Sequence, residues 1–164
     1  MATTAAPYGA RPIGTLSASG SFTGKVRHLP IITTYGTQIS NGDFCKVAAD
    51  GTIAKDTGTT ATTAVGIFMG CSYTDPTTKQ KTFSQFWPAS NAATDAMAYV
   101  LDDPFVVFQM QADEALNTTD RGLNASVVVT AGSTTIGKSK NALDGSTPAT
   151  TNTLPLRIID FVDG

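Results

Sequence analysis

Short apolar or alternating stretches, separated by turn residues, run through most of the chain. The clearest is 64–72, which is apolar nearly throughout and too short for a typical helix that contains two glycines. This pattern predicts a buried central strand. Asp50-Gly51 separates two strand-like segments and predicts a hairpin with a type I′ turn, because both residues tolerate a positive φ. The expected strands are 26–34, 43–49, 52–55, 64–72, 82–87, 97–101, 105–112, 123–131 and 154–162.

The spacing of these strands predicts an all-β fold. Turn residues recur every ~8–12 positions, which is typical of a single compact β-barrel or β-sandwich domain. We expect about eight short antiparallel strands in such a domain, over residues 25–164. The composition agrees, because the 164 residues include a single Glu and only 15% charged residues, while Thr is abundant. Such a composition favours strands and turns over exposed helices. Short helical turns are expected only at 90–98 and 113–121.

Residues 1–24 differ from the rest of the chain. Ala, Gly, Ser, Thr and Pro dominate this segment, and its isolated apolar anchors are Tyr8, Ile13, Leu16 and Phe22. Anchors spaced in this way cannot build a core of their own, but an extended segment can add a strand to an exposed edge of a neighbour. Two interpretations stay open: an extended N-terminal arm that docks on a partner, and a disordered terminus.

Charge and hydropathy argue against two classes of partner. The formal net charge is −2 and no segment clusters Lys or Arg, so we expect no nucleic-acid partner. No apolar run approaches the ~18 residues that a membrane-spanning helix needs, and the start of the chain lacks the pattern of a secretory signal. Cys45 and Cys71 form no metal-binding pair of closely spaced cysteines, and we expect them to be reduced, half-buried side chains.

One sequence motif associated with catalysis is present, and its context is wrong. Gly132–Ser139 matches the phosphate-binding pattern GxxxxGK[ST], but Gly145 and Pro148 would stop the long helix that must follow it. His28 is the only histidine, which leaves neither a histidine pair for a metal nor a plausible catalytic triad.

The acidic residues give no stronger signal. Asp102 and Asp103 are expected to shape a turn before Pro104, since neighbouring side chains of an extended chain point in opposite directions. A calcium site that combines them with Asp75 would have no loop signature. We therefore expect no enzymatic activity, no cofactor and no metal.

Phe83, Phe86 and Trp87 form an aromatic cluster that ends at Pro88. A lone Trp belongs either to the core or to an interface, where aromatic residues are enriched. Sugar stacking on Trp87 together with Tyr73 or Tyr99 is a further alternative. The residues expected to contact a partner are Tyr8, Arg11, Ile13, Leu16, Phe22, Phe86 and Trp87.

Residues 39–112 resemble a known group of viral proteins. The segments that carry the resemblance are Asn41-Gly-Asp, Asp50-Gly51, Ala64-Val-Gly-Ile-Phe-Met-Gly-Cys-Ser-Tyr-Thr-Asp75, Phe86-Trp-Pro88, Ala98-Tyr-Val-Leu-Asp-Asp-Pro104 and Phe108-Gln-Met-Gln-Ala112. In these segments the chain is similar to the small β-rich structural proteins of tailed bacteriophages, in particular those of marine podovirus-type phages, which include capsid decoration (cement) proteins.

The resemblance implies a protein made in the bacterial host cytoplasm that binds the exterior of an assembled phage head and staples neighbouring capsomers. Its partners would be the major capsid protein and further copies of itself, in a dimer or a trimer. The negative net charge also favours the outside of a shell over its DNA-facing interior. The alternative is a glycan-binding or head-fibre-base module on a virion or cell surface.

Overall fold

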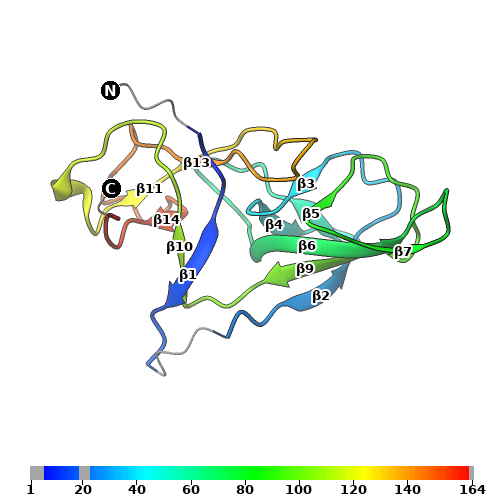
Figure 1. The fold of residues 1–164 in the computed structure, drawn as a ribbon. Coiled ribbons are helices and arrows are strands. Elements are labelled where there is room, and N and C mark those ends of the chain that lie inside the picture. The colour runs from blue at the N-terminus through cyan, green and yellow to red at the C-terminus, as the bar shows by residue number, and fades with distance from the viewer. Residues whose placement is uncertain (1–5, 19–22, 163–164) are drawn as a thin grey trace.

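The computed structural model describes residues 6–18 and 23–162, which form short strands and long connections (Figure 1). A single 3₁₀ turn, Thr118–Asp120, lies within the expected helical segment 113–121. The strands are β1 Arg11–Thr15, β2 Arg27–Pro30, β3 Ile39–Ser40, β4 Phe44–Val47, β5 Ile53–Lys55, β6 Gly66–Thr74, β7 Lys81–Ser84, β8 Phe86–Trp87, β9 Met97–Leu101, β10 Val106–Gln109, β11 Asn124–Ala125, β12 Val127–Val128, β13 Ala142–Leu143 and β14 Leu156–Arg157.

The largest sheet has the strand order β2-β9-β6-β4-β5, and β7 also pairs with β6. All of its pairings are antiparallel. The predicted central strand is confirmed, because β6 pairs with three other strands and most of its residues are buried. The register shifts between Phe68 and Gly70, where Gly70 has a φ of 146° and a side chain would meet the Ser84 carbonyl oxygen at 2.9 Å. A glycine is therefore needed at this bulge.

The hairpin at Asp50-Gly51 is confirmed, but its turn type is not the predicted one. Gly51 N–H donates to the Ala48 carbonyl and Ala48 N–H donates to the Thr52 carbonyl. Gly51 alone takes a positive φ, of 81°. This is the pattern of a type I turn followed by a glycine bulge rather than a type I′ turn. The Asp50 carboxylate accepts the Thr52 N–H, which holds the tight loop together.

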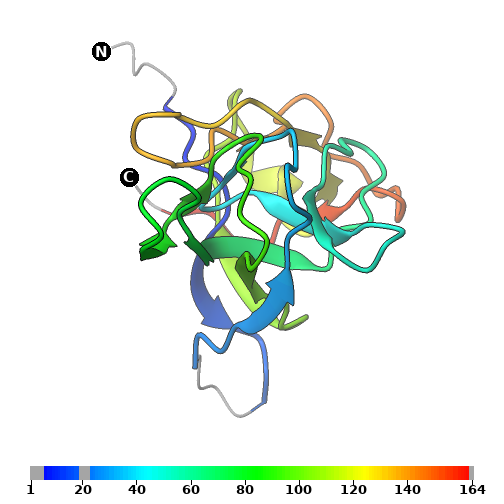
Figure 2. The ribbon, with the colours of Figure 1, turned by 90° about the vertical axis from the view of Figure 1, so that its right-hand side faces the viewer.

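The all-β prediction is confirmed, while the described strands form no closed barrel. Four two-stranded ladders accompany the main sheet: β1-β10, β3-β8, β11-β14 and β12-β13. Where long strands were expected, at 123–131 and 154–162, the structure has only two-residue strands. Side chains interrupt them, since Ser126 N–H donates to the Thr147 hydroxyl and Thr130 N–H donates to the Asn141 side chain. Both views show the end of β1 and the start of β2 at the lower end of the molecule (Figure 1, Figure 2).

The buried apolar side chains form two clusters. We call the first cluster the closed core. It lies on the main sheet and centres on Trp87 and Phe68, neither of which is exposed. The open core, as we call the second, has four buried members: Ala10, Phe44, Ile67 and Val127. Several half-buried side chains complete it: Ala64, Met69, Phe108, Met110, Val129 and Leu156. The second cluster therefore has an apolar boundary that reaches solvent.

An ion pair is buried next to the main sheet. Cys45 lies opposite Lys55 in the β4-β5 ladder, and Asp43 precedes Cys45 by two positions on the same face. The Lys55 ammonium therefore reaches the Asp43 carboxylate diagonally, at 2.9 Å, with both side chains at most 5% exposed. Ser40 N–H and the Ser139 hydroxyl donate to the same carboxylate.

Candidate partner-binding surface

The first described part of the predicted arm is joined to the chain's own domain. Gly9 N–H donates to the Asn141 carbonyl, Ala10 N–H donates to the Gly42 carbonyl, and the Ala10 side chain is buried. Beyond these anchors β1 pairs with β10. The strand addition that the sequence suggested for this segment thus takes place within the chain. Phe22 lies outside the described residues.

Two of the predicted contact residues, Ile13 and Leu16, are exposed at this ladder. Their exposed fractions are 53% and 63%. Ile13 lies at the register shift between Pro12 and Gly14, and Leu16 N–H donates to the Phe105 carbonyl at 2.8 Å. Phe105 itself is 56% exposed. Three large apolar side chains are therefore exposed within or next to the β1-β10 ladder, and we call Ile13, Leu16 and Phe105 the ribbon patch.

Phe105 was missed among the predicted contact residues. The sequence signal for it is the alternation along 105–112, in which Phe105 and Val107 share a side with two glutamines. That side faces away from the apolar residues Val106 and Phe108, so its polar end marks it as the solvent side. The sequence does not show that this strand pairs with residues 11–15.

Tyr8 and Arg11 line a hollow beside the N-terminal segment. The hollow measures about 560 Å³, and Asn41 and Lys138 also contribute to its wall. Arg11 and Lys138 are exposed cations from distant parts of the sequence. This places Lys138 of the GxxxxGK[ST] match beside the N-terminal segment.

The GxxxxGK[ST] match has a structural explanation. Ser139 donates to the buried Asp43 carboxylate at 2.6 Å, and Gly137 packs against the Phe86 ring. The residues after Ser139 lead into strand β13 instead of a helix. The loop therefore lacks the helix N-terminus on which phosphate binding by this motif depends.

Trp87 is not at the surface, contrary to the prediction. Its side chain is fully buried in the closed core and meets the Tyr73 ring edge-on, with 5.5 Å between ring centroids. The β3-β8 ladder holds it there, with Ile39 opposite it. Phe86 is half-buried. Because Tyr73 is also buried, the two rings offer no stacking platform to a sugar.

The nucleophilic and titratable side chains are in unreactive settings. Cys45 and Cys71 are fully buried rather than half-buried as predicted. Burial raises the pKa of Cys71 to about 12. Burial, followed by the nearby Asp43 charge, raises the pKa of Cys45 as well. His28 lies exposed on edge strand β2, with 4.6 Å between the centroids of its ring and that of Tyr99.

The acidic turn before Pro104 is confirmed for one of its two residues. The Asp103 carboxylate accepts the Phe105 N–H, whereas Asp102 forms an ion pair with Arg27. Within residues 6–18 and 23–162 no three His, Cys, Asp or Glu side chains come together in a possible metal site.

No protein-family model matches the chain, and neither a curated protein nor a solved structure is significantly similar to it. In the described part of the chain, no helix is long and apolar enough to cross a membrane. The surface geometry and the sequence resemblance of residues 39–112 are therefore the two indications of function.

Proposed function

We propose that the chain is a phage structural protein that binds the outer surface of an assembled head and staples neighbouring capsomers. The ribbon patch is the single observation that carries this proposal. Three large apolar side chains at one two-stranded ladder, each more than half exposed, favour a surface that contacts a partner over one that only faces solvent.

The backbone of β1 adds a second element to this surface. Among the described strands β1 pairs only with β10, so its other edge offers backbone N–H and C=O groups to a partner strand. A strand of the major capsid protein, or of a sister copy in a dimer or trimer, could pair there while the ribbon patch packs against its side chains.

The mechanism needs only modest affinity at each contact. A protein that binds the assembled lattice and not the free subunits shifts the assembly equilibrium towards the shell. Because a head repeats the same contact many times, small contributions accumulate. The net charge of −2 supports a position on the exterior of the virion rather than beside the genome.

The alternative is a head-fibre-base or glycan-binding module. The glycan-binding form of this alternative loses support. Of the three aromatic residues considered for sugar stacking, Trp87 and Tyr73 are buried and only Tyr99 is partly exposed. The head-fibre-base form would use the same ribbon patch on a different partner.

Cosedimentation with heads purified from the source phage tests the proposal. Phe105→Asp should abolish binding of the chain to the heads, since a buried unpaired carboxylate is costly. Phe83→Asp is the matched control: Phe83 is 74% exposed on β7, outside the ribbon patch. Circular dichroism should show both variants folded. Loss of binding in Phe83→Asp together with full binding of Phe105→Asp would contradict the assignment of the ribbon patch.

A further inference from the structure

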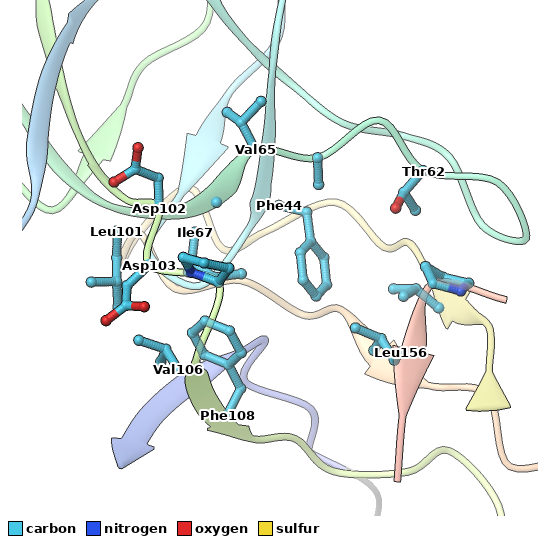
Figure 3. Close-up of a pocket in the computed structure, with 15 residues that line it drawn as sticks. Phe44, Thr62, Val65, Ile67, Leu101, Asp102, Asp103, Val106, Phe108 and Leu156 are labelled. Carbon is cyan, nitrogen blue, oxygen red and sulfur yellow. The ribbon is translucent and has the colours of Figure 1, made fainter. Parts of the chain in front are cut away.

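The open core has an entrance. Its half-buried members Ala64, Phe108 and Leu156 line a hollow of about 330 Å³ together with the buried Phe44 and Ile67. The walls come from the ends of β4, β6, β9 and β10 and from β14 (Figure 3). Apolar side chains at this boundary contact solvent, which leaves free energy to be gained when a ligand covers them.

The hollow has one apolar and one acidic end. Figure 3 shows the rings of Phe44 and Phe108 in its middle, Leu156 on one side, and Asp102 and Asp103 on the other. No Lys or Arg is among the residues that line it. Arg27 offsets the charge of Asp102, while none of the ion pairs among the described residues involves Asp103. The acidic end therefore keeps a negative charge next to an apolar wall.

The acidic end is held in place before any ligand arrives. Asp103 is fixed through its hydrogen bond to Phe105 N–H at 2.9 Å, and Pro104 fixes the backbone between them. Gly66 lies so close to Leu101 that a side chain at position 66 would collide with the Leu101 carbonyl. A preformed hollow of this kind lowers the entropy lost on binding.

We propose that this hollow binds an extended segment of a partner protein in which a large apolar side chain is followed or preceded by Lys or Arg. The apolar side chain would lie between Phe44 and Phe108, and the cation would lie at Asp103. The volume is at the low end of ligand pockets and suits one side chain with its neighbour rather than a cofactor.

This site is distinct from the ribbon patch, although Phe105 of the patch immediately precedes β10, which lines the hollow. Successive residues of a strand point to opposite faces, so Phe105 belongs to the ribbon patch while Val106 and Phe108 line the hollow. The inference therefore does not depend on the proposed attachment to a phage head, and it can fail or hold independently of that attachment.

A methyl NMR titration of the full chain with short peptides tests the inference. Acetyl-Lys-Phe-Lys-amide should shift the methyl resonances of Ile67, Leu101, Val106 and Leu156 in a saturable manner, with a Kd on the order of 1 mM. Acetyl-Glu-Phe-Glu-amide and acetyl-Lys-Ala-Lys-amide, which lack the cations and the ring respectively, should bind several-fold more weakly. No shift of these methyls at about ten times that concentration, or equal binding of the acidic peptide, would overturn the proposal.

Two matched variants isolate the charge at the acidic end. Asp103→Asn keeps the acceptor for the Phe105 N–H and should weaken binding of the Lys-Phe-Lys peptide about two- to fivefold, the range expected for one exposed charge pair. Asp113→Asn is the control, because the Asp113 carboxylate accepts the Gly145 N–H in a similar way, takes part in none of the ion pairs among the described residues and does not line the hollow. Its affinity should match that of the unmodified chain. Equal affinities for both variants would refute the role of Asp103.

Discussion

The closed core and the open core differ in how completely their side chains are shielded from solvent. The fully shielded cluster contributes mainly to stability, and the partly shielded one leaves surface that can bind a partner. The closed core is enclosed by the main sheet and the β3-β8 ladder, and its largest side chains have no exposed surface. The open core lies between the other face of the main sheet, which contributes Phe44 and Ile67, and two-stranded ladders, and it ends in half-buried side chains around a hollow. The two candidate binding sites both adjoin β10: the hollow lies on its open-core face, and Phe105 of the ribbon patch points to the opposite face.

The short ladders explain why the open core is incomplete. A two-residue ladder presents few side chains to its neighbours, whereas the nine residues of β6 contact strands on both sides. Apolar area is therefore buried more completely on the closed-core face of the main sheet than on the face that the short ladders cover. We infer that the main sheet contributes most of the stability and that the β1-β10 side is free to serve binding.

Truncation of one aromatic residue in each core gives the largest expected contrast. Trp87→Ala should lower the free energy of unfolding by about 3–5 kcal/mol, because it leaves a cavity in a close-packed region. Phe108→Ala should cost about 1–2 kcal/mol, because its ring is only partly removed from water. Urea unfolding followed by circular dichroism measures both values. Equal losses in the two variants would mean that the cores are equally well packed.

The buried ion pair gives the next largest effect. Lys55→Met leaves the Asp43 carboxylate buried without its cation and should cost about 3 kcal/mol. This is the lower end of the usual range, since Ser40 N–H and the Ser139 hydroxyl still donate to that carboxylate. Adding Asp43→Asn removes the unpaired charge and should recover part of the loss in the same unfolding assay. A double variant less stable than Lys55→Met alone would contradict this explanation.

A pH dependence at the rim of the main sheet gives the smallest effect. The Thr74 backbone N–H, the Thr74 hydroxyl and the Lys81 ammonium hold the pKa of Asp95 well below its ordinary value. A carboxyl group whose pKa is lower in the folded state contributes stability above its unfolded pKa of about 3.9, and this contribution is lost as the pH falls towards the folded pKa. Asp95→Asn should therefore flatten the fall of the melting temperature below about pH 4. An unchanged pH profile would show that these hydrogen bonds do not persist in solution.

Local patterns in the sequence identified the central strand and one hairpin of the main sheet, but not the order of its strands. The continuous apolar run at 64–72 identified β6, and Asp50-Gly51 identified the β4-β5 hairpin, because both signals depend on neighbouring residues. The exact turn type escaped prediction, since type I and type I′ turns differ by the register of the flanking strands and not by the Asp-Gly pair alone.

The candidate sites depended on long-range contacts that no local pattern contains. Trp87 could belong to the core or to an interface until its pairing with Ile39 was known. Phe105 joined the ribbon patch only through the hydrogen bond that connects it to Leu16. The hollow combines segments from 44 to 156, so its acidic end and its apolar wall could not be associated from the sequence.

Electron cryomicroscopy of intact heads that carry the chain would locate it relative to the shell. We expect density for the chain on the outside of the shell, with β1 and the ribbon patch facing a capsomer or a sister copy. Density inside the shell beside the genome, or a bound chain whose ribbon patch faces solvent, would contradict this expectation.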